Sequence, residues 1–294
     1  SRHPDMSTPT SLELPEGTRR TTVETDRGEF AVLDALPAAG PCERGTALLV
    51  PGYTGSKEDF IAILGQLTAA GRRVVAAELR GQYQTPGPDD PDAYDPRELG
   101  ADVAALFDSV QADHLLGHSF GGLVAREAVL GGCLPTSLTL LSSGPAALYG
   151  PRAEELQFML GYLDGTPAAG LGAKVAEVWH GSLKPQAAAA GVPAPVVAFL
   201  EERMLANNPV GLVTMATHLL KAEDKTAGLA ALGLPCFVLY GEDDNAWLPA
   251  QQRDMAVRLK AERTCIPGAA HSPSVEAPAS TAHALTRFWN AAEK

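Results

Sequence analysis

The sequence contains little cysteine. Among its 294 residues there are four, Cys42, Cys133, Cys236 and Cys265, and none belongs to a C-x-x-C pair. Disulfide frameworks and structural zinc sites need closely spaced, repeated cysteines. We therefore expect reduced thiols in a cytoplasmic protein. Cys236 and Cys265 should be core residues, because each lies in an apolar, strand-like run ("PCFVLY" and "TCIPG").

Basic charge is also scarce. The chain has 23 lysines and arginines against 35 acidic residues, a net charge of −12, and its longest basic runs are the arginine pairs at 19–20 and 72–73. A polyanion requires clustered cations to displace its counterions. This charge distribution argues against nucleic acid or an anionic membrane surface as a partner.

Long apolar runs are missing as well. No segment approaches membrane-spanning length, so we expect no membrane span, and the N-terminus lacks the apolar stretch of a secretory signal. We interpret "SRHPD", residues 1–5 ahead of Met6, as the remnant of an expression tag. The 45% hydrophobic fraction is ordinary for a globular protein with a sizeable core.

What the sequence does contain is an alternation of strand-like and helix-like segments. A hairpin is expected first, from "TRRTTVET" and "GEFAVLDAL" around "DRG". Short apolar runs then alternate with amphipathic helices; the runs are "TALLV", "RVVAAEL", "HLLGH", "TSLTLLS", "PCFVLYG" and "RTCIPG". This order predicts an α/β fold with a mostly parallel, doubly wound sheet covered by helices on both faces.

Residues 146–222 interrupt the alternation. They are rich in alanine, contain Met159, Met204 and Met215, and string helix-like segments together without a clear strand. We expect a helical cap inserted after the strand near 136–142, with a packed subdomain lacking a functional surface as the alternative. The predicted organisation is an N-terminal tail (1–17), a core (18–145 and 223–294) and the cap (146–222). Phe158, Trp179 and Phe199 are expected in the core of the cap.

The segment "GHSFGG" lies where a predicted strand ends and a helix begins. Small neighbours allow a tight turn that exposes the central side chain, here Ser119, at the carboxyl edge of the sheet. The alternative is a glycine-rich turn that contains an incidental serine. Two later segments favour a nucleophile: "GEDD" follows one predicted strand, and "GAAHSPS", with His271, follows the next. The order serine, aspartate, histidine suits a catalytic triad.

These three motifs resemble those of the α/β-hydrolase fold family, from about residue 18 onward. The resemblance implies Ser119, Asp244 and His271 as catalytic residues, with Asp244 preferred over Asp243 from its distance to Gly241. It also implies an oxyanion hole made by the backbone N–H groups of Tyr53 and Phe120. Members of the family often read D-x-R-G-x-G-x-S where this chain has "ELRGQYQTPG", so no subfamily is assigned.

Around this triad we expect Gly52, His118 and Trp247 to line a substrate pocket, with Trp247 near its mouth. The Tyr53 side chain is free either to line the pocket or to pack over the following helix. His114 and His118 are four residues apart but have no evident third ligand, so we expect no metal. No cofactor is expected either.

The predicted function is that of a serine hydrolase that cleaves an ester-type bond (ester, thioester or lactone) of a small, largely apolar acyl substrate. Two other classes remain open. The same triad can perform carbon–carbon cleavage, a lyase step or acyl transfer, and a member of the fold can bind a ligand without catalysis. None of these motifs bears on oligomeric state.

Overall fold

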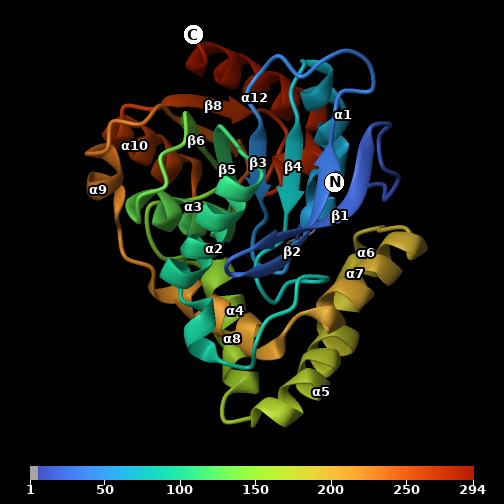
Figure 1. Cartoon of the computed structure of the whole chain (residues 1–294). Helices are drawn as coiled ribbons and strands as arrows, with labels where there is room; N and C mark the ends of the chain where they lie inside the picture. The colour runs from blue at the N-terminus through green and yellow to red at the C-terminus, as the bar shows by residue number, and fades with distance from the viewer. Residues whose placement is uncertain (1–5) are drawn as a thin grey trace.

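The computed structural model describes residues 6–294, so the interpretation of residues 1–5 lies outside the described part. An eight-stranded sheet forms the centre of the molecule, with helices on both of its faces and a group of helices beyond one end of the strands (Figure 1). The strands are β1 (Thr18–Thr25), β2 (Gly28–Ala35), β3 (Ala47–Val50), β4 (Val74–Ala77), β5 (His114–His118), β6 (Ser137–Leu141), β7 (Cys236–Gly241) and β8 (Glu262–Ile266).

The strand order is β1-β2-β4-β3-β5-β6-β7-β8. β1 pairs antiparallel with β2, and β2 pairs antiparallel with β4, whereas every other neighbouring pair is parallel. The predicted mostly parallel α/β sheet is therefore confirmed. Its parallel part brings the carboxyl ends of β3, β5, β7 and β8 to one edge, where the loops that carry the predicted site begin.

Apolar sequence explains the central strands. Every residue of β3, β5, β6 and β7 is buried, because helices cover both faces of the sheet. On one face lie α1 (Ile61–Ala69) and α12 (Pro278–Ala292). On the other lie α2 (Pro96–Ser109), α3 (Phe120–Leu130) and α10 (Pro249–Leu259). Three shorter helices complete this part: η2 (Pro91–Tyr94), α9 (Thr226–Ala230) and α11 (Pro273–Glu276).

Two predicted helix starts carry the expected capping contacts. Ser56 and Asp59 form a capping box, in which the Asp59 carboxylate accepts from the Ser56 N–H at 3.0 Å. This box opens the 3-10 helix η1 (Lys57–Phe60), which leads directly into α1. Asp95 caps α2 by accepting from the Arg97 N–H at 2.9 Å, with Pro96 at the first helical position.

Between β6 and β7 the chain forms the helical insertion, which we define as residues 151–221. It consists of α4 (Pro151–Leu163), α5 (Ala168–Val178), the π-helical turn η3 (Trp179–Leu183), α6 (Lys184–Ala189), α7 (Ala194–Ala206) and α8 (Pro209–Lys221). These green-yellow to orange helices lie together below the sheet in Figure 1. Trp179 and Phe199 are buried in a small core of the insertion, as expected. Phe158 is 83% exposed, so the expectation that it is a core residue is wrong.

The cysteine prediction was half right. Cys236 is buried in β7, but Cys265 is exposed. β8 is the last strand of the sheet, and most of its residues are exposed or half-buried. An edge strand lacks the neighbour that would cover its side chains, and this explains the exposure of an apolar-looking run.

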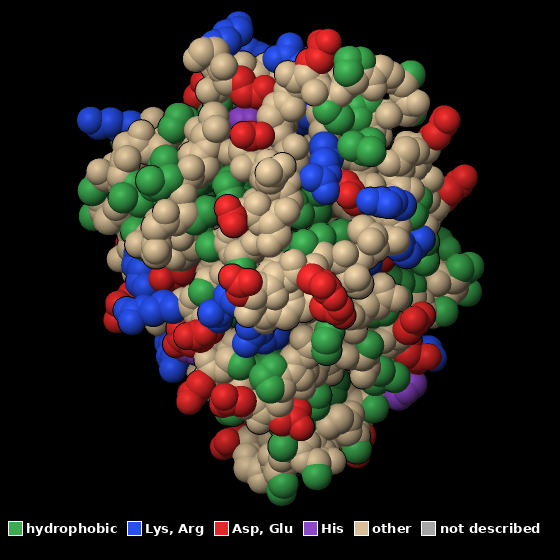
Figure 2. All heavy atoms as spheres, in the orientation of Figure 1, with side chains coloured by type: hydrophobic (Ala, Val, Ile, Leu, Met, Phe, Trp, Pro, Cys, Tyr) green, Lys and Arg blue, Asp and Glu red, His purple; other side chains and the backbone are tan. Residues whose placement is uncertain are grey.

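No helix in the described range 6–294 has the length and apolar character needed to cross a membrane. On the face shown in Figure 2, basic side chains are scattered among acidic ones.

Candidate active site

Ser119 occupies a sharp turn between β5 and α3. Its φ of 55° and ψ of −120° are a strained backbone conformation for a residue other than glycine. The neighbouring glycines are required by packing: a Cβ atom on Gly117 would overlap the Gly121 carbonyl, and one on Gly121 would overlap the Pro51 carbonyl. The turn therefore presses strand and helix together and holds the Ser119 side chain at the carboxyl edge of the sheet.

The structure brings Ser119, His271 and Asp244 together. His271 Nε2 lies 2.8 Å from Ser119 Oγ, and His271 Nδ1 lies 3.0 Å from Asp244 Oδ1. The carboxylate accepts from Nδ1–H, which leaves Nε2 to accept the serine proton. All three residues are buried, so water does not compete for these hydrogen bonds.

The two adjacent aspartates have different surroundings. Asp244 is 3% exposed, and its Oδ2 also accepts from Nε2 of the buried Gln252 at 2.8 Å. Its Oδ1 additionally accepts from the Ala246 N–H at 3.0 Å. Asp243 is exposed and contributes only its backbone N–H, which donates to the Ala269 carbonyl. The side chain that reaches His271 is that of Asp244.

The backbone of Gly52 and Tyr53 lies close to the turn that carries Ser119. A Cβ atom on Gly52 would lie 3.1 Å from the Ser119 Cβ, tighter than ordinary contact. Within residues 6–294, neither the Tyr53 N–H nor the Phe120 N–H donates to a protein acceptor. This is the arrangement expected of an oxyanion hole, whose donors stay available for the substrate.

The Tyr53 side chain both packs and lines the cavity. Its hydroxyl donates to the Leu212 carbonyl of α8 at 2.9 Å, and burial raises the pKa of the phenol. The ring also borders the cavity described below. Tyr53 thus joins the loop after β3 to the helical insertion.

His118 supports the main chain of His271. Its Nε2 donates to the His271 carbonyl at 2.8 Å, and the two imidazole rings lie 5.3 Å apart. Burial, and then the proximity of His271, lower the pKa of His118 to about 4, so its ring stays neutral near pH 7. His114 lies at the other end of β5, where its ring contacts Ser137 and Glu293.

Trp247 lies beneath the site rather than at the mouth of the pocket, which corrects the expectation. It is 1% exposed and its indole N–H donates to the Ala146 carbonyl at 3.0 Å. Its ring fills the space over Gly144, where a Cβ atom would overlap it. The ring centroid lies 6.3 Å from that of His271, and the two rings are tilted by 43°.

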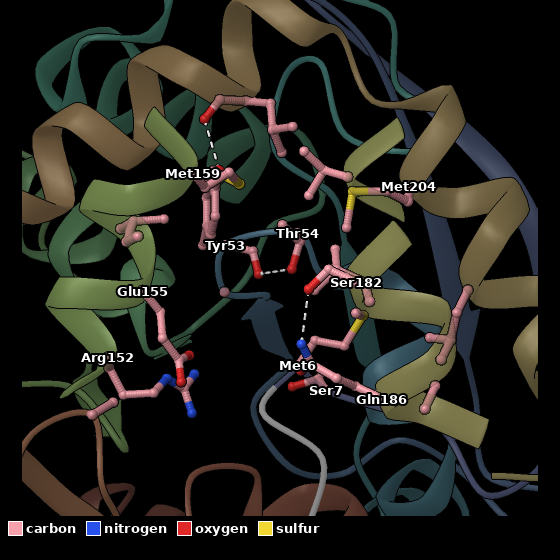
Figure 3. Close-up of a pocket in the computed structure, with 18 of the residues that line it drawn as sticks. Met6, Ser7, Tyr53, Thr54, Arg152, Glu155, Met159, Ser182, Gln186 and Met204 are labelled. Carbon is pink, nitrogen blue, oxygen red and sulfur yellow. Dashed lines mark hydrogen bonds between the residues drawn. The ribbon is translucent and has the colours of Figure 1, made fainter. Parts of the chain in front are cut away.

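A cavity of about 1070 Å³ lies between the helical insertion and the sheet edge, bordered by Ser119, His271, Gly52 and His118. Much of its lining is apolar, including Met159, Leu163, Val175, Leu200 and Met204. Figure 3 shows Arg152 and Glu155 on one side of this cavity and Ser182 and Gln186 on the opposite side. The exposed Phe158 also borders it, so this side chain belongs to the cavity and not to the core of the insertion.

One wall of the cavity is formed by N-terminal residues that no motif in the sequence singles out. Met6, Ser7 and Thr8 line the cavity, and Figure 3 shows Met6 and Ser7 at its edge near Gln186. Ser7 Oγ lies 2.8 Å from Ser272 Oγ, and Arg203 donates to the Ser7 carbonyl at 2.7 Å. A tail without periodicity gives no signal for such contacts, which join residues nearly 200 or more positions apart.

The buried Arg203 also donates to Asp59 Oδ1 at 2.8 Å and to Ser56 Oγ at 3.1 Å. It thereby connects α7, the start of η1 and the N-terminal segment. Over the described part of the chain, no three His, Cys, Asp or Glu side chains gather as metal ligands would.

Residues 47–284 match the model of the alpha/beta hydrolase family. The chain belongs to this family. A segment of 93 residues is 34% identical to the putative carbamate hydrolase RutD of Variovorax paradoxus (strain S110), and the match spans 31% of this chain and 35% of that relative.

Among solved structures, a hydrolase from Pseudomonas aeruginosa PA01 shares 24% identity at a TM-score of 0.68, with 92% of this chain and 98% of that chain covered. The esterase EaEST from Exiguobacterium antarcticum shares 16% sequence identity at a TM-score of 0.73, and the match covers 92% of this chain and 100% of that chain. The enol-lactonase from Burkholderia xenovorans LB400 shares 17% sequence identity at a TM-score of 0.70, and the match covers 92% of this chain and 100% of that chain. At these identities the likeness shows the alpha/beta hydrolase fold.

Proposed function

We propose that this alpha/beta hydrolase is a serine hydrolase that cleaves an ester-type bond through an acyl-enzyme on Ser119. The observation that carries the proposal is the continuous pair of contacts from Ser119 Oγ through His271 to Asp244, at 2.8 and 3.0 Å. A serine hydroxyl becomes an effective nucleophile when a positioned base accepts its proton, and the base needs an acid to orient it.

The proposed reaction has two steps. Ser119 Oγ attacks the acyl carbonyl carbon while its proton passes to His271 Nε2, and the Tyr53 and Phe120 N–H groups bind the resulting oxyanion. The tetrahedral intermediate then expels the leaving group, which takes the proton from His271. Water, deprotonated by His271, attacks the acyl-enzyme in the same way and releases the acid and free Ser119.

We further propose that the helical insertion acts as a cap that selects the acyl group. A cavity of about 1070 Å³ with a largely apolar lining suits a ligand of drug-like size. Two of its lining residues, Met159 and Met204, have flexible side chains that adapt to irregular apolar shapes. The net charge of −12 disfavours polyanionic substrates. The substrate is then a neutral or weakly charged small molecule with an apolar acyl portion.

A carbamate is the second candidate for the scissile group. The relative matched at 34% identity is named a putative carbamate hydrolase, and a carbamate carbonyl would be attacked by the same serine. The match covers about a third of each protein, and the apolar cavity favours an ester with a longer acyl chain.

The test is a series of p-nitrophenyl esters of increasing acyl length, with a p-nitrophenyl carbamate alongside and Ser119→Ala as the inactive control. Each methylene that enters the apolar cavity improves transition-state binding by up to about 0.8 kcal/mol, so kcat/KM should rise with length until the cavity is full. An optimum at acetyl would contradict the proposed acyl pocket. Faster turnover of the carbamate would favour the second candidate.

Hydroxylamine separates hydrolysis through an acyl-enzyme from a lyase step or carbon–carbon cleavage. It intercepts an acyl-enzyme and yields a hydroxamate in place of part of the acid. Absence of hydroxamate while the ester is turned over would overturn the two-step mechanism.

A further inference from the structure

The peptide group between Gly52 and Tyr53 forms different contacts through its N–H and its C=O. Its N–H belongs to Tyr53 and is the proposed oxyanion donor, whereas its C=O belongs to Gly52. Because a peptide unit is planar and trans, its C=O and N–H point in opposite directions. Whatever fixes the direction of the Gly52 carbonyl therefore also fixes the direction of the Tyr53 N–H.

Two donors hold that carbonyl. The Gly55 N–H donates to Gly52 O at 3.0 Å and closes a tight turn. The Gln82 carboxamide donates to the same oxygen at 2.9 Å from the opposite loop, which follows β4. A donor on the carbonyl also polarises the peptide and strengthens its N–H as a hydrogen-bond donor.

The turn formed by residues 52–55 contains a strained backbone conformation. Thr54, its third residue, has a φ of 60°, in the left-handed region that residues other than glycine rarely adopt. Such conformations persist when the surrounding structure imposes them. The contact from Gln82 is a support for this turn that comes from outside it.

The Gln82 side chain is buried and held in one orientation by hydrogen bonds. It is 1% exposed, and its Oε1 accepts from the Leu79 N–H at 2.9 Å, which fixes which end of the amide faces Gly52. Its backbone N–H donates to the Leu79 carbonyl at 3.0 Å, and its carbonyl accepts from the Thr85 N–H at 2.8 Å. Both ends of the carboxamide are thus used, one to hold the side chain and one to hold Gly52.

We propose that Gln82 is a positioning residue that aims the Tyr53 N–H at the oxyanion. This inference rests on the proposed serine-hydrolase function. Gln82 touches no substrate in this account; it acts through the Gly52–Tyr53 peptide. Its effect should therefore appear when negative charge develops on the substrate oxygen and not when the substrate binds.

The experiment compares Gln82→Met and Gln82→Glu with the wild type, using the best p-nitrophenyl ester. Methionine keeps the length of the side chain without a donor. Glutamate keeps the acceptor for the Leu79 N–H and, in assays at a pH at which its carboxyl is ionised, has no donor for the Gly52 carbonyl. The control is Gln84→Met: the Gln84 amide oxygen accepts from Lys57 Nζ at 2.7 Å, and within residues 6–294 this side chain forms no hydrogen bond with residues 52–55.

Loss of a whole oxyanion donor costs about 10² to 10³ in kcat, and a misaimed donor costs less. We expect both Gln82 variants to lose about 10- to 100-fold in kcat, with KM changed by less than about twofold. The affinity for a trifluoromethyl ketone, which forms a tetrahedral oxyanion with Ser119, should fall by a similar factor. The control should keep wild-type kcat and ketone affinity.

Unchanged kcat in either well-folded Gln82 variant would overturn the inference, as would an equal loss in Gln84→Met. If Gln82→Met fails to fold, Gln82→Glu still decides the question, because it retains the contact that mounts the side chain. Wild-type protein without ester turnover would instead refute the proposed function, so the two failures are distinguishable.

Discussion

Helix α3 in the core and helix α4 in the insertion differ in how they are packed. In α3 every residue from Phe120 to Val129 is buried, whereas α4 buries only Ala153 and Leu163 along its 13 residues. A helix that is packed on all sides cannot shift without disturbing its neighbours, so the backbone atoms at its N-terminus are held in place. A helix packed along a narrow stripe leaves its other side chains free to border a cavity. Under the proposed function, the core would fix the catalytic groups and the insertion would shape the space that the substrate enters.

The polar groups show the same contrast. In the core, Ser119, His271 and Asp244 are buried and hydrogen-bonded in a row, and Asp244 also accepts a hydrogen bond from Gln252. In the insertion, the hydrogen-bonded pair Ser182 and Gln186 is exposed at the cavity wall. Substitutions in the core should therefore change rate or stability sharply, and substitutions around the cavity should change substrate preference.

The largest effect should come from Asp244, the proposed acid of the triad. Asp244→Asn should lower kcat by about 10⁴, because an amide cannot hold the tautomer of His271 or stabilise the imidazolium. Asp243→Asn is the matched control, one residue away on an exposed side chain, and should retain nearly full activity. Steady-state ester hydrolysis measures both. A large loss of kcat in Asp243→Asn would show that Asp243, and not Asp244, is the acid that orients His271.

Two phenylalanines of the insertion have different surroundings: Phe199 is packed in its core, whereas Phe158 borders the cavity. Phe199 is 6% exposed and meets the Tyr83 ring edge-on at 5.6 Å, so Phe199→Ala should cost about 3 to 5 kcal/mol in the free energy of unfolding. Phe158→Ala should change that free energy by less than about 0.5 kcal/mol and lower kcat/KM for long acyl chains. Urea denaturation distinguishes them. Equal destabilisation would mean that Phe158 packs in solution.

His118 predicts a smaller, pH-dependent effect on stability. Its pKa is lowered to about 4 in the folded protein, so between that value and about 6.5 the unfolded chain binds a proton that the folded protein does not. Stability should therefore fall on acidification, by about 2 kcal/mol from pH 7 to pH 5.

His118→Gln keeps a donor for the His271 carbonyl and has no such ionisation, so its loss of stability from pH 7 to pH 5 should be about 2 kcal/mol smaller than that of the wild type. His283→Gln, on an exposed side chain, is the control. Urea denaturation at the two pH values measures the difference. An identical pH dependence in wild type and His118→Gln would contradict the lowered pKa.

The sequence predicts the core well because its signals are local. Continuous apolar runs mark buried parallel strands, and Ser56 and Asp95 mark helix starts that the structure shows capped as expected. Ser119 and His271 could be singled out because each follows a strand, and the carboxyl ends of parallel strands share one edge of the sheet.

The failures concern side chains whose place is set by distant partners. Trp247 is buried because Gly144, about 100 residues earlier, leaves room for its ring. Arg203 and Ser7 meet across 196 positions, and Cys265 is exposed because β8 has no further neighbour. Neither periodicity nor spacing reports such tertiary relations.

The central claim is that Ser119 is a nucleophile activated by His271, and intact-mass spectrometry after treatment with a fluorophosphonate tests it most directly. Wild-type protein should gain one adduct, located on Ser119 by peptide mapping. Ser119→Ala, folded to the same melting temperature within a few degrees, should gain none. An adduct that persists on Ser119→Ala, or a wild-type protein that hydrolyses esters without being labelled, would contradict the account.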